Sequence, residues 1–132
     1  EFHKILKSMC NRHDKKYYPK YKKWCDEYFY LPHRKEARGI GGIFFDYKKD
    51  NFEKDFKFVR EVGTTFELIF KKIIKKKIKK KWTLRDKEMQ YIKRGRYTEF
   101  NLLYDRGTKF GLQTGGNVEA ILMSLPPIAK WK

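Results

Sequence analysis

The first third of the chain repeats apolar residues at the spacing of α-helices. One stripe consists of Phe2, Ile5, Leu6 and Met9, at i, i+3, i+4 and i+7, and Cys10 continues it. After a break near residues 13–14, a second stripe consists of Tyr21, Trp24, Cys25, Tyr28 and Phe29. Pro19 lies near the first turn of this second stripe, where a missing N–H costs nothing, and Pro32 ends it. The pattern predicts two amphipathic helices.

A glycine-rich segment, residues 38–46, follows and ends in a short apolar run. Residues 43–45 predict a buried strand, and the glycines before them allow close approach of the backbone. The dinucleotide-binding fingerprint needs a strand before its glycines and a helix after them. Here a strand follows the glycines, which favours a tight turn or close packing over a phosphate site.

Two capping boxes mark the starts of later helices. Asp50 with Glu53 begins a long helix, and Thr83 with Asp86 begins a short one that ends before Gly95. The apolar face of the long helix consists of Phe52, Phe56, Val59, Phe66, Ile69, Phe70, Ile73 and Ile74.

The last third has the pattern of an antiparallel sheet. Residues 97–104 are rich in aromatic and branched residues, residues 109–114 return as a second strand, and residues 105–108 form the turn between them. Residues 115–117 turn again, and a further apolar run follows. Helices packed on an antiparallel sheet give an α+β domain.

The chain is strongly basic. Its 132 residues carry 33 Lys and Arg against 16 Asp and Glu, a net charge of +17. This balance favours polyanionic partners, namely nucleic acid, an acidic membrane surface or an anionic small molecule. The densest run of lysines, residues 71–81, also contains Ile73, Ile74 and Ile78, which is typical of an amphipathic helix with a solvated face.

Hydrophobic residues make up 40% of the chain and aromatic residues 17%, which is enough for the core of one domain. No run of about 18 apolar residues predicts a membrane span, and no signal peptide opens the chain. Cys10 and Cys25 fall on apolar helix faces, so we expect buried free thiols, as in a reducing compartment. We expect a cytoplasmic protein, or alternatively one of the mitochondrion or another organelle. Because Glu1 lies inside a helical pattern, the true start is expected elsewhere.

Few residues in the chain could carry chemistry. His3, His13 and His33 lack the spacing of a zinc site. Asp105 and Arg106 meet beside glycines at the expected end of a strand, where ligands are often held. The residue types alone favour a surface turn with a local ion pair, because Asp and Gly are ordinary turn formers.

Several long sequence segments, in a fixed order along the chain, favour a functional site over a surface turn. They are residues 18–30, 33–34, 38–46, 94–97, 99–112, 114–116 and 119–127, with Trp131. On these runs the chain resembles the oxygen-dependent coproporphyrinogen III oxidase family over nearly its whole length. The resemblance identifies residues 1–132 as the carboxy-terminal part of a single oxidase domain, with a lysine-rich surface segment at residues 71–81. A helix across residues 97–112 would count against the predicted hairpin and against the resemblance.

The resemblance implies a fold and an activity. Family members are homodimers built on a large, flat antiparallel sheet flanked by helices on both faces, of which this chain would supply part. They convert two propionates of coproporphyrinogen III to vinyl groups, giving protoporphyrinogen IX in haem biosynthesis. Molecular oxygen is the oxidant, carbon dioxide and hydrogen peroxide leave, and no organic cofactor is required.

The resemblance also implies roles for particular residues. Asp105 would be the catalytic carboxylate beneath the macrocycle. The substrate would be bound by Arg38, Gly115, Gly116 and Asn117. Arg106 joins them as a guanidinium suited to bidentate capture of a propionate. His3 and His33 match possible ligands of a divalent metal, and His33 and residues 94–130 are linked to dimerisation.

Three departures from the family pattern bear on the site. Tyr47 follows Asp46 where the family usually has a second aspartate, and Asn117 stands where the family commonly has arginine. The family domain is also much longer, and its upstream half carries a histidine and an Asn-x-Arg motif that this chain lacks. We therefore expect the isolated chain to be inactive. The alternatives are a fragment that serves only in assembly and a basic module that binds nucleic acid or an acidic membrane.

Overall fold

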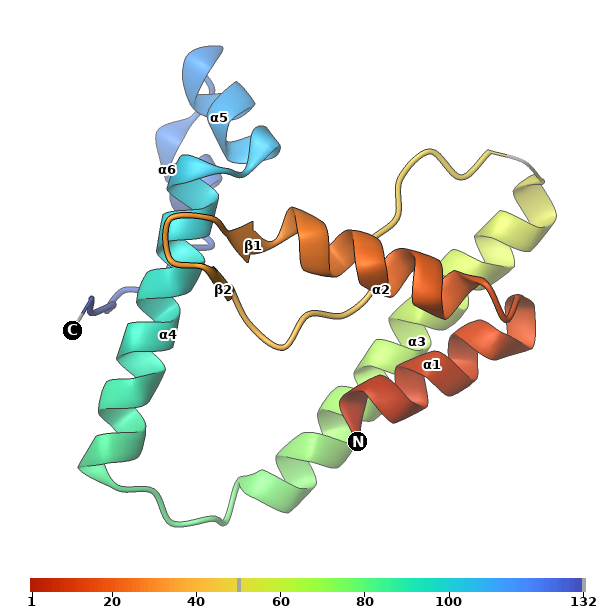
Figure 1. Cartoon of the computed structure of the whole chain (residues 1–132), viewed down its shortest axis with the longest axis horizontal. Coiled ribbons are helices and arrows are strands. Elements are labelled where there is room, and N and C mark those ends of the chain that lie inside the picture. The colour runs from red at the N-terminus through yellow and green to blue at the C-terminus, as the bar shows by residue number, and fades with distance from the viewer. Residues whose placement is uncertain (50, 132) are drawn as a thin grey trace. The chain divides into compact units, whose positions relative to one another are not determined.

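The computed structural model describes residues 1–49 and 51–131, which form two compact units (Figure 1). Unit 1 consists of Glu1–Tyr28 and Gly41–Lys81, and unit 2 consists of Phe29–Ile40 and Trp82–Lys132. Each unit therefore combines two separate stretches of sequence.

Unit 1 is built from α1 (Phe2–His13), α2 (Tyr17–Tyr28) and α3 (Phe52–Lys77). Both helices expected in the first third are confirmed, and so is the long helix. Their buried side chains form one hydrophobic cluster, made up of Leu6, Met9, Cys10, Tyr21, Phe58 and Ile69. The ring of Phe58 is fully buried, and the ring centroids of Tyr17, Tyr21 and Phe45 lie within 5.9 Å of it. Aromatic packing on Phe58 therefore joins α2 and the segment before α3 to α3 itself.

The start of α3 is capped by a side chain. Asn51 Oδ1 accepts a hydrogen bond from the backbone N–H of Lys54 at 3.0 Å, while the expected cap, Asp50, lies outside the described residues. Lys48 and Asp55 form a buried ion pair at 2.8 Å beside this start. Acidic residues in the first turn and lysines in the last turn suit the helix dipole.

The strand predicted at residues 43–45 is wrong, because the structure has an irregular segment there that packs on α2. The Phe44 N–H donates to the Tyr21 carbonyl at 3.1 Å, and the Phe44 ring stacks on Tyr28 with centroids 4.7 Å apart. Close packing at the glycines is confirmed at Gly41. Its φ is +69°, and Asp26 Oδ1 lies 2.8 Å from the position of a Cβ, so only glycine fits there.

Unit 2 combines a short hairpin with helices. Strands β1 (Tyr30–Leu31) and β2 (Glu36–Ala37) pair antiparallel, with Tyr30 opposite Ala37. The helices are α4 (Leu84–Leu103), α5 (Arg106–Gln113) and α6 (Val118–Leu122). The capping box predicted for α4 is confirmed, because Thr83 Oγ1 accepts from the Asp86 N–H at 3.2 Å and the Asp86 carboxylate accepts from the Thr83 N–H at 2.8 Å.

The predicted fold class is wrong. The described residues hold one two-stranded sheet and are otherwise mainly helical, which contradicts an α+β fold with a large flat antiparallel sheet. Residues 97–104 belong to α4 and its C-cap, and residues 109–114 belong to α5 and its C-cap. The preference of aromatic and branched residues for strands depends on context. On α4 the buried residues are Gly95, Glu99 and Phe100, a helical spacing that a strand could not satisfy.

The prediction that a helix ends before Gly95 is wrong. Gly95 lies inside α4, where the C-terminal segment crosses the helix. The Lys130 N–H donates to the Tyr91 carbonyl at 3.1 Å, and Lys130 Nζ pairs with Glu88 at 2.7 Å. A Cβ at position 95 would collide with the Lys130 carbonyl oxygen. Packing, rather than helix termination, therefore requires the glycine.

Residues 71–81 form the end of α3 and the connection that follows it. The lysines of this run are all exposed, with Lys71 paired to Glu67 at 2.5 Å and Lys76 paired to Glu1 at 2.8 Å. Throughout the described part of the chain, no helix combines the length and apolar character needed to cross a bilayer.

Replacing Gly95 by alanine should destabilise unit 2, although alanine favours helix over glycine by about 1 kcal/mol. The methyl group would push the Lys130 backbone off α4, and we expect a net loss of roughly 1–3 kcal/mol in the free energy of unfolding. Gly63→Ala in α3 is the matched control, because no atom outside the helix lies within 4 Å of its Cβ position. It should add about 0.5–1 kcal/mol. Urea unfolding followed by circular dichroism measures both, and equal stabilisation by the two changes would contradict the packing of Lys130 on Gly95.

Candidate functional site

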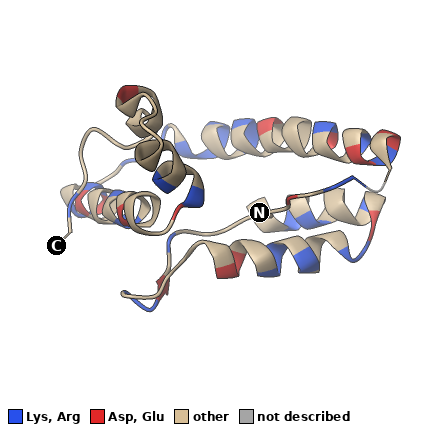
Figure 2. Cartoon of the chain, turned by 90° about the horizontal axis from the view of Figure 1, so that it is seen from above, with Lys and Arg blue, Asp and Glu red and all other residues tan. Residues whose placement is uncertain are grey.

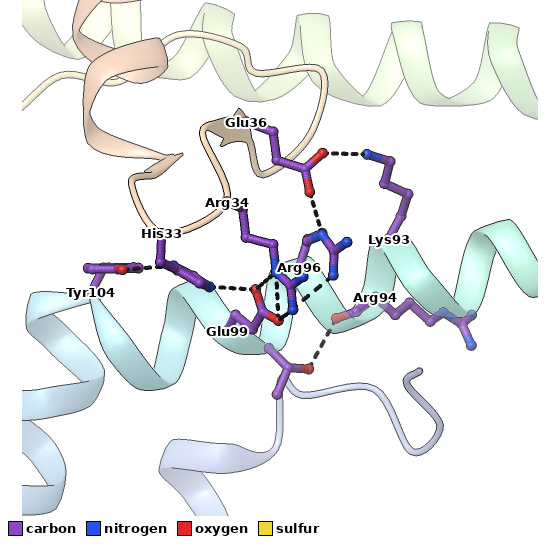
Figure 3. Close-up of polar contacts among 9 residues, drawn as sticks. His33, Arg34, Glu36, Lys93, Arg94, Arg96, Glu99 and Tyr104 are labelled. Atoms are coloured by element: carbon purple, nitrogen blue, oxygen red, sulfur yellow. Dashed lines mark hydrogen bonds and ion pairs between the residues drawn. The ribbon is translucent and has the colours of Figure 1, made fainter. Parts of the chain in front are cut away.

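Polar side chains join the tip of the β1–β2 hairpin to α4 (Figure 3). His33 and Arg34 lie in the connection between the strands, and Glu36 lies on β2. The connection is a tight turn, since the Arg34 N–H donates to the Leu31 carbonyl at 3.1 Å. Side chains from α4 and its C-cap meet the tip, and they are Lys93, Arg96, Glu99 and Tyr104.

Glu99 is the centre of this cluster and is only 8% exposed. Arg34 Nε donates to both of its oxygens, at 2.8 and 3.1 Å, and Arg34 Nη2 donates as well. His33 Nε2 lies 2.9 Å from Glu99 Oε2. Hydrogen bonds from Arg34 lower the pKa of Glu99 from 4.5 to about 2, against the opposing effect of burial, and His33 adds to this shift. Glu99 is therefore a carboxylate over the whole neutral range.

A second carboxylate extends the cluster. Glu36 accepts from Arg96 Nε and lies 3.3 Å from Lys93 Nζ, and the hydrogen bond from Arg96 lowers the pKa of Glu36. Arg96 Nη1 is buried without a hydrogen-bond partner among the described residues, but it lies 3.8 Å from Glu99 Oε1. Arg96 thus stands between two carboxylates and balances the charge of both.

His33 is held through both ring nitrogens. Its Nδ1 lies 2.8 Å from the Tyr104 hydroxyl, while its Nε2 faces the Glu99 carboxylate. A carboxylate only accepts, so the network assigns a proton to Nε2. In the neutral ring, Nδ1 then accepts from Tyr104. The imidazole therefore links the hairpin to the C-terminal end of α4.

The predicted metal ligands do not fit a metal site in this structure. Both nitrogens of His33 are taken by protein groups, and His3 Nδ1 lies 3.1 Å from the Tyr18 hydroxyl. Within residues 1–49 and 51–131, no group of three or more His, Cys, Asp or Glu side chains is placed to hold a metal ion.

Arg38, a predicted substrate-binding residue, packs against aromatic rings. Its guanidinium carbon lies 4.2, 5.1 and 4.9 Å from the ring centroids of Phe29, Tyr97 and Phe100. Its backbone N–H donates to the Phe29 carbonyl at 3.2 Å. Stacking on three rings limits the rotamers of the arginine and stabilises its charge.

Asp105, the predicted catalytic residue, lies at the junction of α4 and α5 and caps α5. Its Oδ2 accepts from the Thr108 N–H at 2.8 Å and from the Thr108 hydroxyl at 3.0 Å. Arg106 is the first residue of α5 and is exposed. The predicted hairpin turn is thus a helix N-terminus, which uses the same residue types.

The predicted glycine contacts lie in the connection from α5 to α6. Gly115 has a φ of +72°, and a Cβ at Gly116 would stand 2.9 Å from the Gly111 carbonyl oxygen, so backbone geometry requires both glycines. Asn117 Oδ1 accepts from the Ala120 N–H at 3.2 Å and caps α6. Unit 2 therefore carries every predicted site residue except His3, which belongs to unit 1.

Sequence reasoning missed Glu99 and the residues around it other than His33. With residues 97–104 interpreted as a strand, Glu99 had no distinctive place. In a helix it shares a buried face with Gly95, and a carboxylate on such a face requires a cationic partner. That requirement, applied to the neighbouring His33–Arg34 pair, is the signal that could have identified the cluster.

Comparison with known proteins identifies the family, which the geometry alone does not define. A family model described as "Coproporphyrinogen III oxidase" matches residues 1–132. Oxygen-dependent coproporphyrinogen-III oxidase of Rickettsia rickettsii (strain Sheila Smith) is 60% identical over 132 residues, which are 99% of this chain and 47% of that protein. Proteins of the same name from Rickettsia bellii (strain OSU 85-389) and Rickettsia akari (strain Hartford) are 60% and 59% identical over the same shares.

The chain belongs to the coproporphyrinogen III oxidase family. It spans about half the length of the curated relatives it matches. Membership rests on sequence agreement along the whole chain. The helices at residues 97–112 therefore contradict the predicted hairpin, and the expectation that they would also contradict the family was wrong.

Replacing Glu99 by glutamine tests the cluster. Because the pKa of Glu99 is lower in the folded than in the unfolded chain, the folded state binds fewer protons. The carboxylate therefore contributes stability above about pH 4.5 that is lost as the pH falls towards 2. Glu99→Gln should lower the free energy of unfolding at pH 7 by about 2 kcal/mol and should flatten its dependence on pH between 2 and 5.

Glu67→Gln is the control for this experiment, because Glu67 is exposed and pairs with Lys71 on the surface of α3. It should change the stability at pH 7 little. Urea titrations at a series of pH values give both curves. An unchanged pH profile in Glu99→Gln would show that the carboxylate is not held in the way described.

Proposed function

We propose that this chain forms part of an oxygen-dependent coproporphyrinogen III oxidase. The observation that supports this most is the agreement along the entire chain with relatives of that name. In the proposed reaction each of two propionates loses carbon dioxide and one hydrogen and becomes a vinyl group. Each propionate carboxylate thereby releases two electrons and one proton, which together with one solvent proton reduce one molecule of oxygen to hydrogen peroxide. The comparisons offer no support for the alternative of a nucleic-acid or membrane module.

The substrate is a macrocycle with four propionates, and its negative charge suits a chain of net charge +17. We assign propionate capture to Arg106, which is exposed at the start of α5, and to Arg38, whose guanidinium is oriented by aromatic stacking. Gly115 and Gly116 would allow the macrocycle to approach the backbone closely. Asn117 would supply an amide where an arginine is common, in addition to capping α6.

The role proposed for Asp105 is electrostatic. Two hydrogen bonds from Thr108 hold the Asp105 carboxylate in place as the cap of α5. Pyrrole N–H groups of the substrate could donate to the same carboxylate. Its charge would also stabilise the positive charge that develops as a pyrrole gives electrons to oxygen. Capping holds the carboxylate in place before substrate binds, which is the condition for an electrostatic contribution to turnover.

A homodimer through residues 94–130 is also part of the proposal. Apolar side chains in this segment, including Phe110, Val118 and Met123, are exposed on the chain. His33 contacts residues of its own chain, so its link to dimerisation would act through the position of α4.

Asp105→Asn should preserve the fold and lower turnover by about 100-fold or more, as removal of one preorganised charge often does. The test uses a complete enzyme, in which this chain is joined to the part of the R. rickettsii protein that it does not span. Asparagine caps helices as well as aspartate, so α5 should persist. Asp86→Asn, which alters the capping carboxylate of α4, is the control and should leave turnover unchanged. Oxygen uptake with coproporphyrinogen III measures both. Normal uptake by Asp105→Asn would rule out the proposed role.

The 132-residue chain alone should show no oxygen uptake with coproporphyrinogen III. The proposed site takes a further histidine and an Asn-x-Arg motif from elsewhere in the family domain. The complete enzyme of the preceding experiment is the positive control. Turnover by the chain alone would show that unit 1 and unit 2 contain all the groups the reaction needs.

A further inference from the structure

Helix α3 has a second apolar face that the rest of unit 1 leaves exposed. Its members are Phe52, Phe56, Val59, Phe66, Phe70 and Ile74, each at least 40% exposed. The buried side chains of α3, by contrast, are Asp55, Phe58, Thr65 and Ile69. We call the first set the outer stripe of α3. The helix therefore has one apolar face that packs in unit 1 and another that contacts solvent.

The outer stripe has the geometry of a helix-packing surface. With Gly63 included, its positions are separated by steps of 4, 3, 4, 3, 4 and 4 residues, close to the repeat of a packed seam. Two pairs of rings are already stacked, Phe52 on Phe56 at 5.9 Å and Phe66 on Phe70 at 6.3 Å. No atom outside the helix lies within 4 Å of a Cβ built at Gly63, so the pairs flank a notch that a partner side chain could enter.

The chemistry of the stripe argues against a lipid occupant. At 3.6 residues per turn the stripe covers an arc of only about 80°. An interfacial helix presents a broad apolar face bordered by lysine and arginine. By helical spacing, the border of this stripe carries both signs of charge, with Glu53 and Glu67 as well as Arg60 and Lys71. Figure 2 shows acidic and basic residues interspersed along the chain's helices. A narrow stripe with a mixed border suits a polypeptide.

Local charge also argues against a second α3 as the occupant of the stripe. Each copy of α3 would bring its own lysine run, residues 71–81, to the contact. Like charges oppose association. The apolar stripe and the lysine run would both be matched by an occupant that has an apolar face and some carboxylates near the C-terminal half of α3.

We propose that the outer stripe of α3 binds the part of the family polypeptide that this chain does not span. The relatives are about twice as long as the region matched here, since the match covers 47% of the R. rickettsii protein. This remaining part is long enough to supply an element that runs along the whole of α3. Packing of the stripe in the assembled polypeptide does not depend on the proposed activity.

Thiol labelling tests the proposal with a matched pair of positions. Phe66 is 58% exposed on the outer stripe, and Leu68 is 56% exposed beside Lys71 and Lys72 on another face. The native Cys10 and Cys25 are buried, and burial raises the pKa of Cys10 to about 11, so background labelling is low. In the 132-residue chain, Phe66→Cys and Leu68→Cys should react at similar rates. In the complete chain, joined to the remainder of the R. rickettsii protein, Cys at position 66 should react at least ten-fold more slowly than Cys at position 68.

Each other labelling outcome overturns the proposal. Equal rates at the two positions in the complete chain would show that the remainder does not cover the stripe. Protection of position 66 in the 132-residue chain that grows with concentration would assign the stripe to a second copy. Protection that is independent of concentration would assign it to unit 2. Protection that appears only with anionic vesicles would assign it to lipid.

A second measurement does not require the joined chain to fold. The 132-residue chain carries an affinity tag and is produced in the same cells as the remainder of the R. rickettsii protein. The two should co-purify, and the pair of changes Phe66→Asp and Phe70→Asp should reduce recovery of the remainder at least ten-fold. The control pair, Thr64→Asp with Leu68→Asp, adds the same charge on another face of α3 and should leave recovery of the remainder unchanged. Equal recovery with both double variants would overturn the assignment of the occupant.

Discussion

The burial of one carboxylate determines much of unit 2. Glu99 lies on the inner face of α4 beside Phe100, where an ionised group is stable only with cations and hydrogen-bond donors around it. Arg34 and His33 supply these from the hairpin, and their backbone is fixed by the tight turn that joins β1 to β2. The same histidine engages Tyr104 at the end of α4. The carboxylate therefore positions the helix end from which Asp105 and α5 continue.

Local signals in the sequence predicted the helices of unit 1 and the start of α4, because caps and apolar spacing act over a few residues. They failed for residues 97–114, where aromatic and branched side chains suggested strands. The decisive contacts there are distant in sequence: Arg34 with Glu99, and the Lys130 backbone with Gly95. Such contacts leave no periodic trace, and a glycine required by a crossing segment looks the same as a glycine that ends a helix.

The site residues around Asp105 were predicted from the family resemblance, because the residue types alone favoured a surface turn. Asp105, Gly115, Gly116 and Asn117 each have a backbone role in the structure, as caps or as tight connections around α5 and α6. The interpretation of the Asp105 segment as an ordinary turn was therefore partly right about local geometry, although the turn opens a helix. A structural role does not compete with the proposed chemistry, because a capped carboxylate and a constrained backbone are already ordered before a ligand arrives.

Helix α3 shows the limit of pattern analysis most clearly. Its apolar residues predict a single broad face, yet the structure divides that face in two, with Ile69 against the core and Phe66 and Phe70 in solvent. The periodicity of a sequence reports which positions avoid water, but it does not report how many partners they pack against. A helix with one partner needs an apolar arc wide enough for that partner, and further apolar width costs solubility unless something covers it. The width of the apolar arc on α3 therefore supports packing of this helix against partners on two of its faces.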